Sequence, residues 1–273
     1  MPETAMNRAN VPAAASHSRW LYVVGQVAVW AALLIFRRWL SSEFMLLRMT
    51  GVIRSGPKAI PTTAGDCFTL LQAHPLLGFT LLNGFDMANF VLAGVVFLVL
   101  YAALRRTNRI FMILTVALMF ASIVVYIASN PAYPMLSLSG QYAAATTEAQ
   151  RSALLSEGQA VLAAKSPNAL GQNVAFCFFH TAGLIVSVVM LHSEIFSKTT
   201  AYLGILFNGF GLGFPIGMAL APGNVAVAGT AWIVAVIFWV LWYIGIARTF
   251  HRLSVAVEVP LRGNHRPSAA SHL

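Results

Sequence analysis

Residues 75–106 of this chain read PLLGFTLLNGFDMANFVLAGVVFLVLYAALRR. The second half of this stretch is an apolar run, Phe90 to Leu104, which ends at the pair Arg105 and Arg106. A single helix from Pro75 to Leu104 would be about 45 Å long at a rise of 1.5 Å per residue. That length exceeds the roughly 30 Å of a bilayer's hydrocarbon core. The stretch therefore predicts a membrane-spanning helix that begins at Pro75, a residue suited to a first helical position.

The composition of the whole chain also indicates a membrane protein. Of its 273 residues, 58% are hydrophobic and 9% are charged, and the mean hydropathy is +0.74. Soluble domains carry about 25% charged residues, so a soluble fold could not bury this much apolar surface. The net charge is +9. Because the basic residues sit beside apolar runs, they indicate membrane topology, and we expect the lipid bilayer and not nucleic acid as the partner.

The apolar runs predict an all-α, polytopic membrane helical bundle with six transmembrane helices. The predicted spans are 20–36, 75–104, 110–128, 174–191, 202–221 and 230–247. We expect residues 1–19 to form a disordered cytoplasmic tail, residues 20–250 a single transmembrane domain, and residues 251–273 a basic, mostly disordered cytoplasmic tail.

Two long connections separate the predicted spans. Residues 37–74 contain several basic residues and prolines, and predict a loop with a short interfacial helix over 40–49. Residues 129–173 contain Thr147 and Gln150, spaced as in a capping box. The helical spacing of the apolar residues that follow predicts an amphipathic helix, lying either on the membrane surface or on the bundle.

The distribution of positive charge leaves two topologies open. Six spans with a cytoplasmic N-terminus place ten basic residues inside and seven outside. A seventh span over Cys67 to Leu82, with Asn83-Gly84 as a turn and the N-terminus outside, would place thirteen inside and four outside. That span is short and contains a proline at residue 75. Helix length therefore favours six spans, and both topologies place the C-terminus in the cytoplasm.

The sequences of several segments resemble an uncharacterised bacterial family of polytopic inner-membrane proteins, which is defined only by a domain of unknown function. The resemblance covers about residues 68–250, and the segments that carry it are Ser129-Asn130-Pro131, Met135 to Ser139, Gln141 to Thr147, Gln150-Arg151, Gly158-Gln159, Met190 to Ser193, Ile195 to Lys198, Ala201 to Ile205, Trp242-Tyr243 and Ala247-Arg248. It implies about six helices and a bacterial plasma membrane, and it brings no activity, cofactor or catalytic residue.

Asp86 is the one carboxylate inside a predicted span, which makes it a candidate functional residue. Counting from the ends of the predicted spans places Asp86, Tyr126 and His180 near the outer edge of the bilayer. Asn83 and Asn89 share this level. We expect these five residues either to form a ligand pocket under the 129–173 connection or to serve as helix caps and helix–helix contacts.

The leading functional hypothesis is non-enzymatic: binding or transport of a small molecule or lipid, or a scaffold role. The alternative is an outer-leaflet enzyme in which Asp86 orients His180 as an acid–base pair. The sequence predicts no cofactor and no metal site, since Cys67 and Cys177 have no metal-ligand spacing with histidine. A disulfide between these two cysteines stays open.

A last motif concerns helix packing. Gly209, Gly213 and Gly217 form two overlapping GxxxG steps in the span over 202–221. Small residues at this spacing let two helix backbones approach closely in a membrane. Pro215 in the same run predicts a kink, so a moving helix of a transporter is the alternative interpretation.

Overall fold

The protein is all α-helical in the part of the chain that the computed structural model describes, and that part contains no strand. The described residues are 19–35, 37, 63–163, 170–220 and 225–263. The helical stretches that are long and apolar enough to cross a membrane are Asp86–Leu104, Arg109–Ala144, Leu170–Leu191 and Ile233–Ala256. These findings confirm the all-α class and the membrane-spanning character predicted from the sequence.

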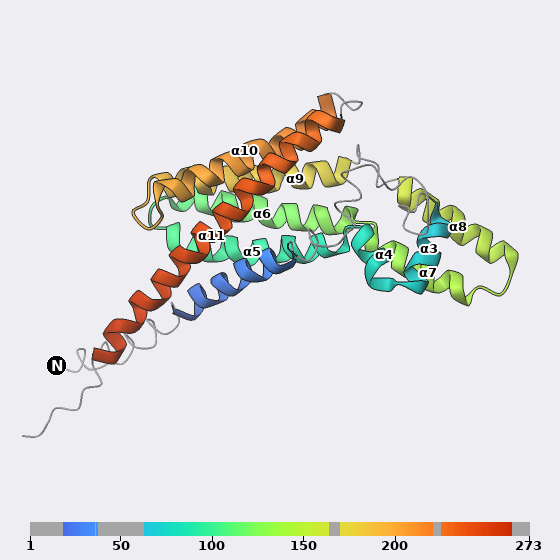
Figure 1. Ribbon diagram of the computed structural model, residues 1–273, viewed down its shortest axis with the longest axis horizontal. Coiled ribbons are helices and arrows are strands. Elements are labelled where there is room, and N and C mark those ends of the chain that lie inside the picture. Colours follow the sequence, from blue (N-terminus) through green and yellow to red (C-terminus); the bar gives the residue numbers. More distant parts are fainter. Residues whose placement is uncertain (1–18, 36, 38–62, 164–169, 221–224, 264–273) are drawn as a thin grey trace, which may run out of the picture.

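The long helices form a bundle (Figure 1). Its members are α5 (Gly84–Leu104), α6 (Arg109–Ser129), α9 (Leu170–Leu191), α10 (Lys198–Leu220) and α11 (Val225–Gly263). In this bundle α6 packs between α5 and α9, and α10 packs between α9 and α11. The long α11 runs obliquely to the other members and extends past them at one end (Figure 1).

A shorter apolar helix, Arg19–Ile35, lies against the bundle. Its Gly25 faces Val99 of α5 and Phe250 of α11, and a Cβ atom at this glycine would come within 2.9 Å of either side chain. The ring of Tyr22 lies 6.2 Å from the ring of Phe250, measured between centroids. This helix therefore packs at the junction of α5 and α11.

Four further helices form a second, smaller unit at one end of the bundle, which we call the cap (Figure 1). The cap consists of α3 (Ala64–Ala73), α4 (Pro75–Leu81), α7 (Ala132–Ala144) and α8 (Glu148–Ala163). It has its own apolar core, whose buried members are Ala64, Cys67, Phe68, Leu71, Leu82, Ala132, Met135 and Leu138. We refer to this end of the bundle as the cap end. The opposite end, where Arg105, Arg106 and Arg248 lie, is called the basic end.

The single helix predicted from Pro75 to Leu104 is wrong, because the chain breaks between α4 and α5. Asn83 has a left-handed backbone with φ of 62°. Asparagine tolerates this conformation better than most residues, and one such residue ends a right-handed helix. At the next residue, a Cβ atom on Gly84 would lie 2.2 Å from the ring of Phe79. The Asn-Gly pair thus supplies both the turn and the close approach that redirect the chain.

The alternative seventh span over Cys67 to Leu82 also differs from the structure. This segment forms α3 and α4, helices of ten and seven residues that are separated at His74. Each is far shorter than the roughly 20 residues that a membrane helix needs. Both pack against α7 instead.

The two connections contain more helix than the sequence indicated. The first was expected to be a loop through residue 74, but residues 64–73 form α3. Its expected helix over 40–49 lies outside the described residues. The second contains α7, which begins directly after Pro131. Proline cannot continue α6, yet its fixed φ suits the start of the next helix.

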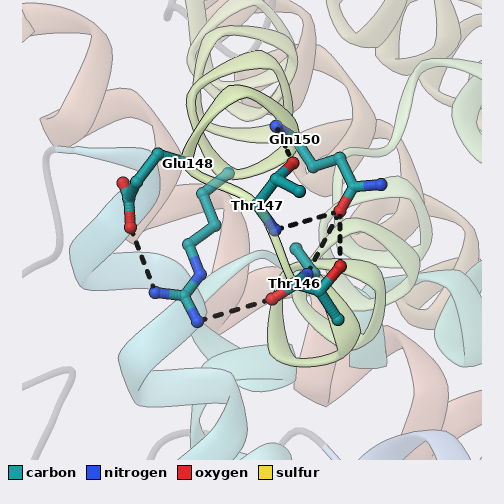
Figure 2. Close-up of polar contacts among 6 residues, drawn as sticks. Thr146, Thr147, Glu148 and Gln150 are labelled. Atoms are coloured by element: carbon teal, nitrogen blue, oxygen red, sulfur yellow. Dashed lines mark hydrogen bonds and ion pairs between the residues drawn. The ribbon is translucent and has the colours of Figure 1, made fainter.

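The amphipathic helix of the second connection is present as α8, and its capping box is confirmed (Figure 2). The backbone amide of Gln150 donates to Oγ1 of Thr147 over 3.2 Å, and the amide of Thr147 donates to Oε1 of Gln150 over 3.3 Å. The backbone amide of Thr146 donates to the same Oε1 atom over 3.1 Å. The helix lies on α3 and α7, with Gly158 packed against the ring of Phe68.

The last helix is longer than expected. The sequence predicted a span ending at Ala247 and a mostly disordered tail over residues 251–273, whereas α11 continues to Gly263. Residues 1–18 and 264–273 lie outside the described residues, so the predictions for the terminal tails are untested there.

Candidate functional site

Asp86 lies in the first turn of α5, at the cap end of the bundle. Its position follows from the turn at Asn83, which starts the helix three residues earlier. The first backbone amides of a helix have no intrahelical acceptor, so a carboxylate in this turn is stabilised by their partial positive charge. The side chain of Asp86 is partly exposed. A helix terminus and partial exposure together make a charge tolerable at this level.

Tyr126 of α6 is a hydrogen-bond partner of this carboxylate. Its hydroxyl donates to Oδ2 of Asp86 over 3.4 Å. The tyrosine is buried, with 1% of its surface exposed, and its ring stacks on Phe90 at a centroid distance of 3.9 Å. Because Phe90 lies one helical turn after Asp86, the same two helices hold both contacts. The predicted association of Asp86 with Tyr126 is therefore present.

The side chain of Asn130 links the helices around Asp86 and Tyr126 by hydrogen bonds. Its Nδ2 atom donates to the carbonyl oxygen of Asn83 over 3.2 Å, and its Oδ1 atom accepts from the amide of Ala132 over 2.9 Å. One buried carboxamide thus connects the start of α5, the end of α6 and the start of α7. Asn83 serves here through its backbone, so its predicted role as a ligand-binding side chain stays a prediction.

Two further carboxamides, from the cap-end turns of α5 and α9, each have a buried polar atom without a hydrogen-bond partner among the described residues. The Oδ1 atom of Asn89 and the Nε2 atom of Gln172 are buried, and neither has a hydrogen-bond partner within the described residues. Asn89 directly precedes Phe90, and Gln172 lies one turn before Phe176. The rings of Phe90 and Phe176 are in contact, with centroids 5.8 Å apart. Buried polar groups are nearly always satisfied, so such a pair marks a place where a partner belongs.

An aromatic layer lies below this group of polar side chains. It consists of Phe90, Tyr126, Phe176 and Phe179, which come from α5, α6 and α9. The rings of Tyr126 and Phe176 lie 5.9 Å apart, and those of Phe90 and Phe179 lie 5.3 Å apart. Edge-to-face and tilted arrangements at these distances are favourable, and they leave little room between the rings.

His180 lies on the other side of this layer and has a different partner from the one predicted. Its Nδ1 atom lies 3.2 Å from Oδ1 of Asn208 in α10, and the Nδ2 atom of Asn208 donates to the carbonyl of Gly204 over 2.7 Å. Since Oδ1 can only accept, this arrangement assigns the proton of the neutral imidazole to Nδ1. The imidazole is buried among Phe176, Phe179 and Phe207.

Close packing between α9 and α10 surrounds the His180–Asn208 pair. A Cβ atom on Gly211 would lie 2.2 Å from the imidazole, and one on Gly183 would lie 2.1 Å from Oδ1 of Asn208. Gly204 is equally tight, against Ser187 and the indole of Trp242. The close packing of two helices that was predicted for this span is present, but the glycines in contact are Gly183, Gly204 and Gly211.

The predicted GxxxG packing at Gly209 has no counterpart within this chain and stays a prediction. This residue is exposed, and a Cβ atom there would have no neighbour within 4 Å in this chain. Gly213 and Gly217 are partly exposed residues of the same helix. Sequence reasoning missed the packing face because it followed the spacing of four residues. Gly204, Asn208 and Gly211 recur at i, i+4 and i+7, which is the signal that identifies the buried face.

The cysteines and the metal-ligating residue types form no site in the described part of the chain. Cys67 and Cys177 are not joined by a disulfide; Cys67 is buried in the core of the cap and Cys177 lies in α9. No three side chains of histidine, cysteine, aspartate or glutamate gather there in a way that could hold a metal ion.

Comparison with known proteins adds no further assignment. No protein-family model, no curated protein and no solved structure matches this chain. The resemblance to a bacterial membrane family thus stays a prediction, and the functional argument depends on the geometry of the chain itself.

Proposed function

We propose that this protein is a bacterial inner-membrane protein that binds a small polar molecule or a lipid headgroup at its cap end, without catalysis. The proposal is carried by two buried polar atoms, Oδ1 of Asn89 and Nε2 of Gln172, that have no hydrogen-bond partner among the described residues. They belong to the cap-end turns of α5 and α9, the helices whose Phe90 and Phe176 pack on the ring of Tyr126, the partner of Asp86. An unsatisfied polar group within a membrane protein is costly because lipid offers it no hydrogen bond. A bound ligand would remove that cost.

The ligand in this proposal has mixed chemistry. Asp86 and the carboxamide of Asn89 offer acceptors, and the amide nitrogen of Gln172 offers a donor. Phe176 adds an apolar surface beside them and is partly exposed. A molecule with both donors and acceptors next to an apolar portion fits this combination, as the headgroup and first carbons of a lipid do.

We further propose six spans, with helix Arg19–Ile35 and α10 completing the four that length and composition identify. The ring of Tyr22 lies 6.2 Å from the ring of Phe250, which lies between Arg248 and Arg252 in α11, so the first helix starts at the basic end. An N-terminus at the same end as the C-terminal part of α11 requires an even number of spans. The positive-inside rule then assigns the basic end to the cytoplasm and the cap to the outer side.

Binding has more support than transport through the centre of the bundle. The aromatic layer separates the polar group around Asp86 from the His180–Asn208 pair, whereas a transport path would need polar groups along its length. The same layer weakens the enzyme alternative, because Nδ1 of His180 is engaged by Asn208 and its ring is enclosed by phenylalanines.

Native mass spectrometry of the purified full-length protein tests this proposal. We expect the wild type to retain a defined molecule after detergent release, and Asp86→Asn to lose at least about 80% of it. Glu157→Gln is the matched control, because it removes an exposed carboxylate from the far side of the cap. Absence of any retained molecule, or equal retention in Asp86→Asn and wild type, would overturn the proposal.

A further inference from the structure

The basic end carries a large excess of positive charge that the proposed ligand site does not use. Exposed cationic side chains come from the first helix, from the end of α5 and from the starts or ends of α6, α10 and α11. They are Arg19, Arg105, Arg106, Arg109, Lys198, Arg248 and Arg252. In the described part of the chain, the acidic residues at this end are Glu194 and, near the end of α11, Glu258.

Among the described residues, most of these cations have no acidic partner. Arg105, Arg106, Arg109 and Arg248 form no ion pair with any described residue, whereas Arg151 at the opposite end pairs with Glu148. Two of the other cations donate to neutral oxygens: Lys198 to the carbonyl of Leu191, and Arg252 to the hydroxyl of Thr249. Unpaired guanidinium groups near one another repel, and an anion between them relieves that repulsion.

Part of this charge is concentrated where three helices meet. The first helix packs on α5 and α11 through Gly25, Val99 and Phe250, as described above. At that junction the charges of Arg105 and Arg106 are close enough to act on the hydroxyl of Tyr22. The junction therefore presents two guanidinium groups and a phenol, all of which donate hydrogen bonds to phosphate oxygens.

The depth of the junction indicates the source of the phosphate. The two arginines directly follow the apolar run of α5, so they lie where the hydrocarbon core gives way to headgroups. Tyr22, Phe196 and Phe250 lie at the same level, with ring centroids of neighbouring pairs 6.2 and 6.3 Å apart. Aromatic and basic side chains together are typical of the headgroup region of a bilayer.

We propose that the junction of helix Arg19–Ile35 with α5 and α11 binds the phosphate of an anionic phospholipid. Arg105 and Arg106 contact the phosphodiester, and Tyr22 donates to one of its oxygens. Guanidinium groups suit this role because they bind phosphate through two parallel hydrogen bonds. Basic pockets between membrane helices are known to bind the headgroups of such lipids. This inference is independent of the ligand proposed for the cap end.

The test measures lipid retention at the junction. The purified full-length protein is incubated with phosphatidylglycerol or with phosphatidylcholine, and bound lipid is counted by native mass spectrometry. We expect wild type to retain phosphatidylglycerol at least about fivefold over phosphatidylcholine, and Arg105→Gln/Arg106→Gln to lose that preference. Raising the salt concentration should weaken the preference in wild type, because screening weakens exposed charge pairs.

Arg151→Gln is the matched control, since it removes an exposed arginine from the cap and should leave the preference unchanged. If the double variant does not fold, as judged by its elution in gel filtration, the two single variants replace it and each should lose part of the preference. Equal retention of both lipids by wild type, or an unchanged preference in the arginine variants, would overturn the proposal. Displacement of the lipid by inorganic phosphate at equal concentration would also overturn it, by showing a site for free anions.

Discussion

The backbone of Gly211 lies directly against the imidazole of His180, so closely that a Cβ atom at this glycine would come within 2.2 Å of Cε1. The contact joins the middle of α9 to the middle of α10. It is accompanied by the hydrogen-bonding distance between His180 and Asn208, one turn earlier in α10. A polar pair enclosed by aromatic rings therefore depends on the absence of a single methyl group.

Gly211→Ala should destabilise the protein by about 1–3 kcal/mol, because the new methyl group would force the buried imidazole out of position. Gly209→Ala, two residues away in the same helix, is the control. It should be neutral or stabilise by up to about 1 kcal/mol, since alanine is the better helix former and meets no neighbour. Thermal unfolding of both variants in the same detergent measures the difference. Similar melting temperatures would contradict the observed packing.

Asn208→Leu should lower stability by about 1 kcal/mol, in the range found for hydrogen bonds between membrane helices. The variant leaves the Nδ1–H group of His180 buried without an acceptor. Removing both partners in His180→Phe/Asn208→Leu should recover part of the loss, because no polar group is then left unsatisfied. The comparison uses unfolding midpoints in a common detergent. A double variant less stable than Asn208→Leu would show that the pair does not act through this bond.

The contact between Asp86 and Tyr126 should appear as an interaction free energy in a double-mutant cycle. We expect about 1 kcal/mol between Asp86→Asn and Tyr126→Phe, below the usual value for a bond to a charged group because the contact is 3.4 Å long. Unfolding free energies of the wild type, both single variants and the double variant supply the four corners. Additive effects of the two substitutions would exclude a direct hydrogen bond.

Thr147→Ala should destabilise the start of α8 by about 1 kcal/mol, because the amide of Gln150 loses its cap. Hydrogen–deuterium exchange of peptides from residues 146–155 should become several times faster, while exchange in α6 stays unchanged. Ser152→Ala is the control, an exposed hydroxyl on the same helix. Equal exchange in the two variants would contradict the role of the capping box.

The sequence predicted the features that depend on composition and short-range chemistry. The apolar run of α6 was placed within one residue of its observed ends, because Arg109 and Pro131 bound it on both sides. The capping box at Thr147 and Gln150 was equally recognisable, since it needs only two side chains at a fixed spacing. The contact of Asp86 with Tyr126 followed from counting residues along two helices.

Features set by tertiary packing were harder to predict. The turn at Asn83-Gly84 was recognised only in the seven-span alternative, because helix length favoured one continuous helix from Pro75 to Leu104. The structure shows the left-handed backbone of Asn83 and the steric contact of Gly84 with Phe79 that redirect the chain there. The cap helices α3 and α7 show only a weak helical spacing of apolar residues in the sequence. They are stabilised by packing against each other, which the sequence does not display. The partner of His180 was missed because helical depth gives the level of a residue and not the direction in which it points.

The carboxamide of Asn130 has a mechanical consequence. It is hydrogen-bonded both to Asn83, before α5, and to Ala132, at the start of α7. The cap is therefore linked to α5 and α6 through one side chain. A pulling force applied to the cap would pass through this side chain into α5 and α6 together. The cap would then resist extraction as a continuation of the bundle, and a tether attached to it would report the strength of the membrane helices.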